Sequence, residues 1–415
     1  MRTRKVAAAA TCLLVLGASA CGSDDEDDDG GSSSGDSSSA ASSGGGTLRI
    51  GLMTELTGPG AAQKGDRTAT GFNARMATNA EEGGACADTD VELVDADTAS
   101  NPQGALTAAQ RLVEQEDVYA IIGASQLFYA AADYLTTQAS DIPVLGPATD
   151  GAPQWLQSDT NLFPASPPPL TDVSFTTTGE YLADQGVTKV AGVAVAVPAS
   201  QQSLETILQS AEAVGLERGY VNDSLPLGSE DVGAVVLGIE ESGSDGLYLP
   251  ITTNSAVAVM QGLSQAGYDF KAAILASGYG ASSLENQPFV DAAQGATFTV
   301  GYTPVEVEND ATARLKESME AAGVPQGIPD LGQIQGWLTA DLLLHGLELA
   351  GCDATQDELM TALEEDASWD ADGLLPQAFD FTDHRDLGQN CSYFVTLEGD
   401  EFVPSSDEAI CGEEI

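Results

Sequence analysis

The sequence has few positively charged residues. Lys and Arg total 14 against 64 Asp and Glu, which gives the 415-residue chain a formal net charge of −50. Nucleic-acid binding depends on clustered cations that meet phosphates, so nucleic acid is not expected as a partner. The excess of carboxylates predicts a solvated acidic surface instead.

Histidine and the common catalytic motifs are also scarce. The chain has only His345 and His384, and no cysteine pair has CxxC spacing, so no metal site is expected. There is no GxSxG elbow. The GPG tract at 58–60, with Gly65 after it, lacks the spacing of a dinucleotide loop. We therefore expect a protein that is not an enzyme and holds no cofactor.

Long apolar runs are missing as well, except for a short one at the N-terminus. Arg2, Arg4 and Lys5 precede an apolar stretch at 6–16 that is too short to span a bilayer, and small residues then lead to Cys21. This order predicts that residues 1–20 are an export signal.

The tract ASAC that ends at Cys21 resembles the lipobox of bacterial lipoproteins. The resemblance implies acylation of Cys21 and a chain anchored by lipid to the outer face of the bacterial cell membrane. Ala18 stands where that family usually has leucine, so secretion without an anchor is the alternative. Residues 21–46 are acidic and then rich in Ser and Gly, which predicts a disordered tether.

Four cysteines remain for an exported body, and they suggest two disulfides. They are Cys86, Cys352, Cys391 and Cys411, and three pairings are open from the sequence. We favour Cys391 with Cys411, because the residues that follow Cys391 read as a hairpin with its turn at 398–400. Cys86 then pairs with Cys352.

Strand and helix patterns alternate along the body. Strands are expected at 48–53, 91–97, 118–123 and 142–147, and helices near 71–80, at 102–115 and at 127–138. After the proline-rich join at 163–169, a second series begins. Its expected helices are 172–185, 201–214 and 255–267, and its expected strands are 189–197, 233–241 (or partly a helix), 245–251 and 271–277. This alternation predicts an α/β protein with two parallel sheets, each covered by helices.

The last third of the body has three helical patterns and the cysteine hairpin. The helices are expected at 311–323, 336–351 and 357–365, and the hairpin spans 391–404.

Several segments together resemble type I periplasmic binding proteins, particularly the group for branched-chain amino acids and amides that serves ABC importers. The resemblance rests on the order of IGLMTELTGPGA, IIGAS, IPVLGPATDGAP, GWLTADLLLHGLELAG and GLLPQAFDFTD, and it covers nearly the whole exported body. It implies two Rossmann-like lobes joined by a three-crossover hinge, with ligand held between them. Lobe 1 is then 47–166 with a return at 300–375, and lobe 2 is 167–299 with the hairpin region 376–415 in lobe 2 or the hinge.

The resemblance also assigns ligand-binding positions. Ser125 matches a serine that binds the ligand carboxylate, and Ala148, Thr149 and Asp150 match a loop that gives backbone and hydroxyl contacts. Ser125 also suits the N-cap of the helix that follows it. Tyr279 and Tyr302 are candidate aromatic contacts, with packing at a lobe edge as the alternative.

Two positions depart from the pattern of the amino acid binders. Ser200 and Gln201 stand where the family has a tyrosine and a glycine, and Ser277 stands where amino acid binders carry the glutamate that meets the ligand ammonium. A buried ammonium without a counter-charge is costly, so either Asp150 or Glu285 replaces that glutamate or the ligand has no ammonium. An amino acid, an amide and a carboxylic acid without an amine all stay open.

The resemblance implies a function as well. We expect a monomeric solute-binding lipoprotein that delivers a small polar organic ligand to an ABC permease and its ATPase subunits. The alternative is a sensor that presents bound ligand to a membrane signalling partner.

Overall fold

The computed structural model describes residues 47–168, 173–383 and 390–415. The predictions for the export signal, for Cys21 and for the tether concern residues 1–46, and they lie outside the described residues, as does His384. Among the described residues, no helix is both long and apolar enough to cross a membrane.

The first sheet has five parallel strands in the order β2-β1-β3-β4-β5. Their apolar runs are buried in the centre of the sheet, as expected for strands covered on both faces. The strands are β1 (Leu48–Thr54), β2 (Val91–Asp97), β3 (Ala120–Gly123), β4 (Val144–Gly146) and β5 (Leu162–Pro164).

Helices from two distant parts of the chain contact this sheet or pack on the helices that do. The early ones are α1 (Arg67–Glu82), α2 (Pro102–Gln115), α3 (Tyr129–Gln138) and the 3₁₀ turn η1 (Pro153–Leu156). The late ones are α10 (Asp310–Ala321), η2 (Pro325–Gly327), α11 (Leu331–Ala350) and α12 (Gln356–Glu364).

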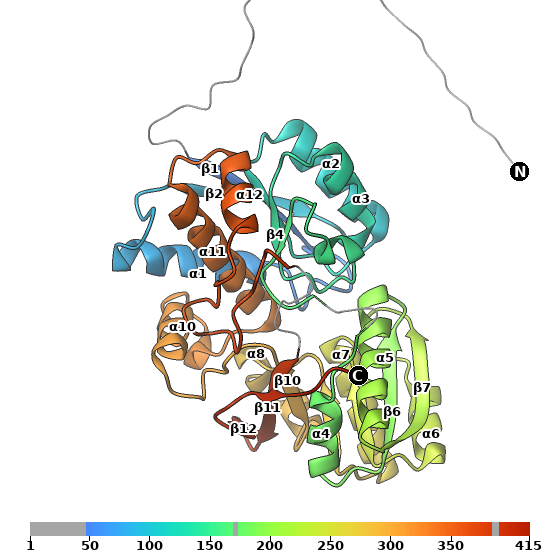
Figure 1. Cartoon of the computed structure of the whole chain (residues 1–415). Helices are drawn as coiled ribbons and strands as arrows, with labels where there is room; N and C mark the ends of the chain where they lie inside the picture. Colours follow the sequence, from blue (N-terminus) through green and yellow to red (C-terminus); the bar gives the residue numbers. More distant parts are fainter. Residues whose placement is uncertain (1–46, 169–172, 384–389) are drawn as a thin grey trace, which may run out of the picture. The chain divides into compact units, whose positions relative to one another are not determined.

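Helices α1 and α11 lie side by side (Figure 1). Glycines permit this contact, since a Cβ on Gly71 would lie 1.8 Å from the carbonyl oxygen of Gln333 and one on Gly336 would lie 2.0 Å from that of Thr68. The chain therefore returns from the second sheet to the helices of the first after β10, and both α10 and α11 pack on α1.

The second sheet has the order β12-β11-β10-β9-β8-β6-β7. Its parallel strands are β6 (Lys189–Val195), β7 (Glu217–Leu225), β8 (Gly246–Leu249), β9 (Ala272–Leu275) and β10 (Thr297–Val300). Its helices are α4 (Thr177–Asp184), α5 (Pro198–Ala213), α6 (Gly233–Ser242), α7 (Thr253–Ala266), α8 (Ala281–Leu284) and α9 (Gln287–Ala292).

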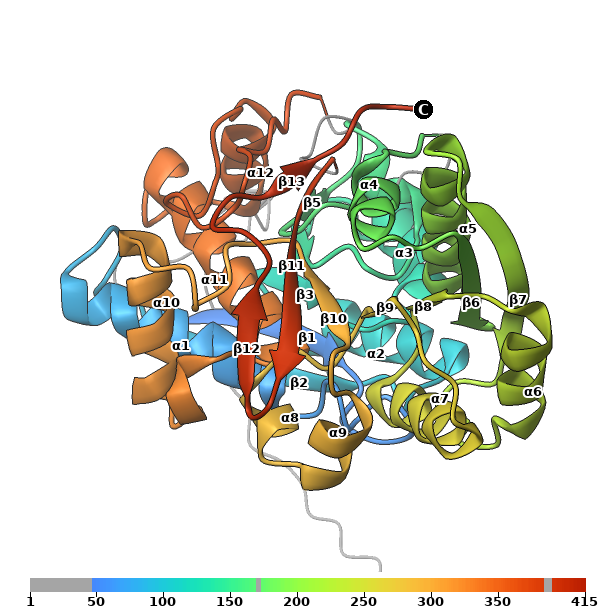
Figure 2. The ribbon, with the colours of Figure 1, turned by 90° about the horizontal axis from the view of Figure 1, so that it is seen from below.

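The C-terminal strands complete the second sheet. β11 (Cys391–Glu398) pairs antiparallel with β10 and with β12 (Glu401–Pro404), as Figure 2 shows, and β13 (Ile410–Cys411) pairs with the start of β11. The predicted hairpin is present at these residues.

Both preferred disulfides are present. Cys391 lies opposite Cys411 in the β11–β13 pair and is bonded to it, and Cys86 is bonded to Cys352 after α11. The partner that aligns the C-terminal pair is β13, not the hairpin strand β12.

For the segment 233–241, which the sequence left open between a strand and partly a helix, the structure has a helix. Residues 233–241 form the helix α6, in which Val235 and Ile239 lie one turn apart and are buried, and Gly243 ends the helix in the left-handed region. The strand of this part of the sheet is β7, which the sequence analysis missed. β7 lies at the sheet edge, where exposed and half-buried residues hide the apolar pattern of a central strand.

Candidate functional site

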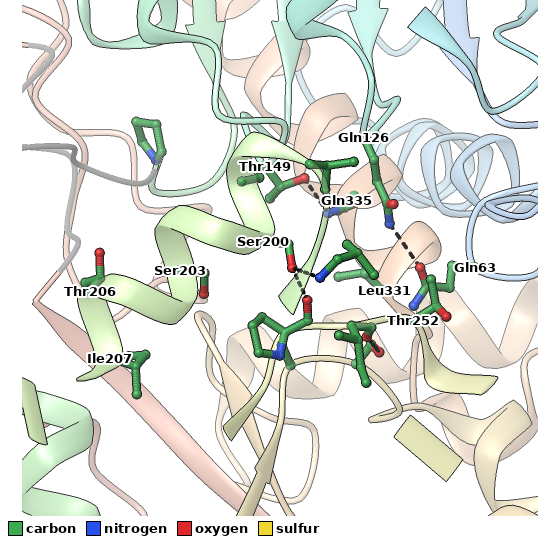
Figure 3. A pocket seen from close by; sticks show the side chains of 18 of the residues that line it. Gln63, Gln126, Thr149, Ser200, Ser203, Thr206, Ile207, Thr252, Leu331 and Gln335 are labelled. Atoms are coloured by element: carbon green, nitrogen blue, oxygen red, sulfur yellow. Dashed lines mark hydrogen bonds between the residues drawn. The ribbon is translucent and has the colours of Figure 1, made fainter. Parts of the chain in front are cut away.

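A cavity of about 400 Å³ lies where strands of both sheets end. Its walls come from the segments that follow the carboxyl ends of β1, β3 and β4 in the first sheet and of β6, β8 and β9 in the second, together with α5 and α11. Figure 3 shows Ser200, Ser203, Thr206 and Ile207 along α5, with Ser200 at the end of this row toward Gln335 and Leu331. The carboxyl ends of parallel strands are the usual ligand-binding edge of such sheets.

Two neighbouring cavities of about 330 and about 360 Å³ share part of this lining. Ser277 and Leu331 line all three cavities. We therefore treat the three as one cleft, and we call the residues that line them the cleft lining.

Three of the predicted polar positions are on the walls of the main cavity. Ser200 accepts a hydrogen bond from the Val195 backbone N–H and donates to the Pro250 carbonyl. Ser277 donates to the Ile251 carbonyl over 2.9 Å. Thr149 accepts a bond from the Gln335 side-chain amide at 3.4 Å. Both serine hydroxyls therefore donate their hydrogen bonds to backbone carbonyls.

The two predicted tyrosines lie in the neighbouring cavities. Tyr279 donates to the Glu306 carboxylate over 2.7 Å, whereas the buried Tyr302 hydroxyl has no hydrogen-bond partner in the described structure. Burial raises the pKa of both phenols and of Glu306. Both tyrosines also contact each other edge to face.

Three other predicted positions do not line the cleft. Ser125 is buried, donates to Glu55 over 2.7 Å and accepts from the Leu127 backbone N–H. This bond lies in the turn before α3, whose N-cap residue is Phe128, so Ser125 is not the N-cap of that helix. Ala148 is buried with φ near +52°, in the left-handed region. Asp150 is buried and accepts hydrogen bonds from Trp155 and from the Ala152 backbone.

The candidate replacements for the ammonium-binding glutamate are not in the cleft lining either. The Asp150 carboxylate accepts hydrogen bonds from donors within the protein, and Glu285 is exposed at the end of α8. The main cavity has no Asp or Glu in its described lining.

Lys64 is the main functional candidate that the sequence analysis missed. It follows β1, lines the main cavity, is 0% exposed, and donates a hydrogen bond to the side-chain carbonyl of Gln335. Burial lowers its pKa to about 8, and the negative charges of Glu55 and Asp150 oppose that shift. The only available signal was a lone lysine in a glycine-rich turn of a chain that has few cations.

The sequence between Thr47 and Glu401 matches the model of a protein family described as periplasmic binding protein. The chain belongs to this family. The match covers nearly all of the described residues, so it confirms the predicted family and fold class. Because it is a family of binding proteins, it also confirms the prediction of a binder instead of an enzyme.

Solved structures of periplasmic binding proteins share this fold at low sequence identity. A branched-chain amino acid ABC transporter protein from Thermus thermophilus with bound valine has a TM-score of 0.73 at 16% identity, over 89% of this chain and 97% of that one. A solute-binding protein from R. palustris in complex with benzoate has a TM-score of 0.70 at 18% identity, over 88% of this chain and 97% of that one. A fatty acid ABC transporter substrate-binding protein from Thermomonospora curvata has a TM-score of 0.71 at 19% identity, over 88% of this chain and 93% of that one.

No curated protein matches the sequence of this periplasmic binding protein. At identities below 20%, the solved structures establish its fold and leave its ligand open.

Proposed function

We propose that this protein is the extracytoplasmic solute receptor of an ABC importer and that it holds a small polar organic molecule in the cleft between its two sheets. The cleft lining carries this proposal, because strand ends from both sheets meet around a single cavity. A ligand there touches both sheets, so its binding free energy favours the arrangement in which the sheets lie close together.

The two sheets serve as two lobes in this proposal. Residues 47–166 and 300–375 form lobe 1, and 167–299 with 376–415 form lobe 2. The chain passes between the sheets after β5, after β10 and before β11, which supports a hinge made of three crossovers. The protein acts as a monomer and engages the permease when ligand is bound.

The direct test is retention of a small molecule. Purified protein is incubated with spent culture medium, desalted and denatured, and the released compounds are measured by mass spectrometry. We expect about one compound per chain. Ala276→Trp, which fills the cavity from the end of β9, should lose it, whereas Ala213→Trp on the exposed end of α5 should keep it.

The importer and the sensor differ in their partner. Ligand-loaded protein should stimulate the ATPase of its permease complex in proteoliposomes, and the ligand-free protein should do so much less. Stimulation of a membrane kinase, with no effect on an ABC ATPase, would favour the sensor instead. Absence of any retained compound would contradict both functions.

The lipid anchor has a separate test. Cys21→Ala removes the acylated thiol and should release the protein from the membrane fraction into the medium. Cys12→Ala, within the export signal, is the matched control and should leave the protein in the membrane fraction. A Cys21→Ala protein that stays there would rule the anchor out.

A further inference from the structure

The two lobes touch each other directly beside the cleft, at two glycines. Gly228, in the segment after β7, faces Pro59, in the segment after β1, and a Cβ on Gly228 would lie 2.9 Å from the Pro59 Cβ. Gly151, after β4, faces the start of α5, and a Cβ on it would lie 3.0 Å from the Ala199 backbone nitrogen. Atoms in ordinary contact are about 3.5 to 4.0 Å apart, so neither place has room for a side chain. We call these two the glycine contacts.

We infer that Gly228 and Gly151 are positioning residues for ligand binding, because each lets the lobes meet closely beside the cleft and thereby favours the closed arrangement that holds the ligand. The inference rests on the proposed function, and it adds residues that set the affinity through lobe closure.

The contact between Gly228 and Pro59 lies apart from the hinge. Residues next to all three crossovers line the cavity of about 360 Å³, namely Pro167, Gly301 and Cys391. Pro59 and Gly228 line the cavity of about 330 Å³, and none of those three residues is in its described lining. Hinge opening separates the lobes most at places away from the hinge. This contact is therefore one that opening breaks and closure restores.

Two polar contacts also pass from lobe to lobe in the cavity of about 330 Å³. Gln63 donates to the Thr253 hydroxyl at the start of α7 over 3.4 Å, and Arg67 of α1 donates to the Ser282 hydroxyl of α8 over 3.2 Å. All four residues line that cavity. Hydrogen bonds need short distances, so these bonds form only when the lobes are as close as the glycine contact allows.

The glycine contacts act on affinity through the population of closed molecules. Both partners of each contact belong to the protein, so the contacts favour closure whatever the chemistry of the ligand. The apparent affinity of a ligand is proportional to the fraction of protein in the arrangement that binds it. A side chain that keeps the lobes apart should lower this fraction and weaken binding, although every group that touches the ligand is unchanged.

Asparagine variants place a side chain into each contact. The φ angles of Gly228 and Gly151 are +72° and +82°, a region that asparagine tolerates better than most residues do. Gly186→Asn is the matched control, because Gly186 has a φ of +75° and a Cβ there would meet nothing within 4 Å. All three variants therefore have a similar backbone cost, and only Gly228→Asn and Gly151→Asn disturb a lobe contact.

The first measurement is the rate at which a bound compound is lost. Each protein is loaded from spent culture medium and dialysed, and the compound that the wild type retains is followed by mass spectrometry. We expect Gly228→Asn and Gly151→Asn to lose it about fivefold or more faster than Gly186→Asn does. Urea unfolding shows whether the variants are folded and equally stable. Gly228→Ala, paired with Gly186→Ala, is the smaller change to use if Gly228→Asn does not fold.

The second measurement needs no ligand. Small-angle X-ray scattering of the ligand-free proteins should give a larger radius of gyration for Gly228→Asn and Gly151→Asn than for Gly186→Asn and the wild type. The inference is overturned if both variants match Gly186→Asn in the rate of loss and in the radius of gyration. Retention of no compound by the wild type contradicts the proposed function instead, and scattering then still decides whether the glycine contacts hold the lobes together.

Discussion

Lys64 and Asp150 are buried residues that follow the carboxyl ends of β1 and β4, at one edge of the first sheet, and the pKa of each is shifted toward neutral. Burial lowers the pKa of Lys64 to about 8 and raises that of Asp150 to about 7, and each side chain offsets part of the other's shift. Glu55 is the other acid that acts on Lys64, and the pKa of the Tyr129 phenol is raised by burial and then by the charge of Asp150. The charge at this edge therefore becomes more negative as the pH rises.

This titration predicts a pH dependence of binding. Between about pH 6 and about pH 9, Asp150 gains a negative charge and Lys64 loses its positive one, so affinity for a negatively charged ligand in the nearby cleft should fall by about tenfold. A carboxylate ligand would itself stay ionised over that range. Titration calorimetry at constant ionic strength measures the change. An affinity that rises over the same range would point to a cationic ligand, and Lys64→Met should flatten the curve.

Ser125 gives a second prediction for a single residue. Its hydroxyl joins Glu55 to the start of the segment leading into α3, so Ser125→Ala should lower the free energy of unfolding by about 1 to 3 kcal/mol. Urea unfolding of the ligand-free protein checks this. Ser264→Ala, at an exposed position of α7, should change stability by less than about 0.5 kcal/mol. If Ser125→Ala instead left stability intact and weakened ligand binding, the hydroxyl would belong to the site.

At the scale of elements, the contact between α1 and α11 positions one wall of the cleft. Gly71 and Gly336 let the two backbones approach each other, and α11 carries Leu331 and Gln335 into the cleft lining. Gln335 in turn accepts from Lys64, which precedes α1. Packing of the two helices and the polar contacts of the cleft are thus coupled.

Gly336→Ala should therefore affect stability and binding together. The new methyl group would meet the Thr68 carbonyl oxygen and force the helices apart, at a cost of about 1 to 3 kcal/mol in the free energy of unfolding. A shift of α11 should also weaken ligand binding. Gly233→Ala is the control, because a Cβ at that position of α6 meets nothing within 4 Å. Thermal unfolding measures the stability of both variants, and titration calorimetry measures their ligand affinity. Equal stability and equal affinity of the two variants would contradict the proposed role of the helix contact.

For the whole molecule, the dominant feature is its negative charge. With 64 acidic and 14 basic residues, most carboxylates have no cation to pair with, and their mutual repulsion opposes the compact state. Mobile cations screen this repulsion.

We expect the melting temperature to rise by several degrees between about 0.05 M and about 1 M NaCl at neutral pH. Differential scanning calorimetry measures it. Near pH 4, where many carboxylates are protonated, the same addition of salt should have a smaller effect. A melting temperature at neutral pH that is flat or falls with salt would show that charge repulsion contributes little to the stability.

The sequence by itself determined features that depend on neighbouring residues. The alternation of apolar runs and helical spacing predicted the parallel sheets, and the turn at 398–400 predicted the C-terminal hairpin. The order of several sequence segments along the chain predicted the protein family. These signals are local because a strand or a turn is specified mainly by its own residues.

Only the tertiary structure decided which side chains share the cleft. It placed Lys64 against Gln335, 271 positions along the chain, and turned Ser125 and Asp150 to partners within the protein. It also made 233–241 a helix and 217–225 an edge strand, where local apolar content is a poor guide. The physical reason is that burial and charge depend on segments that meet only after folding, whereas periodicity is already present in the chain.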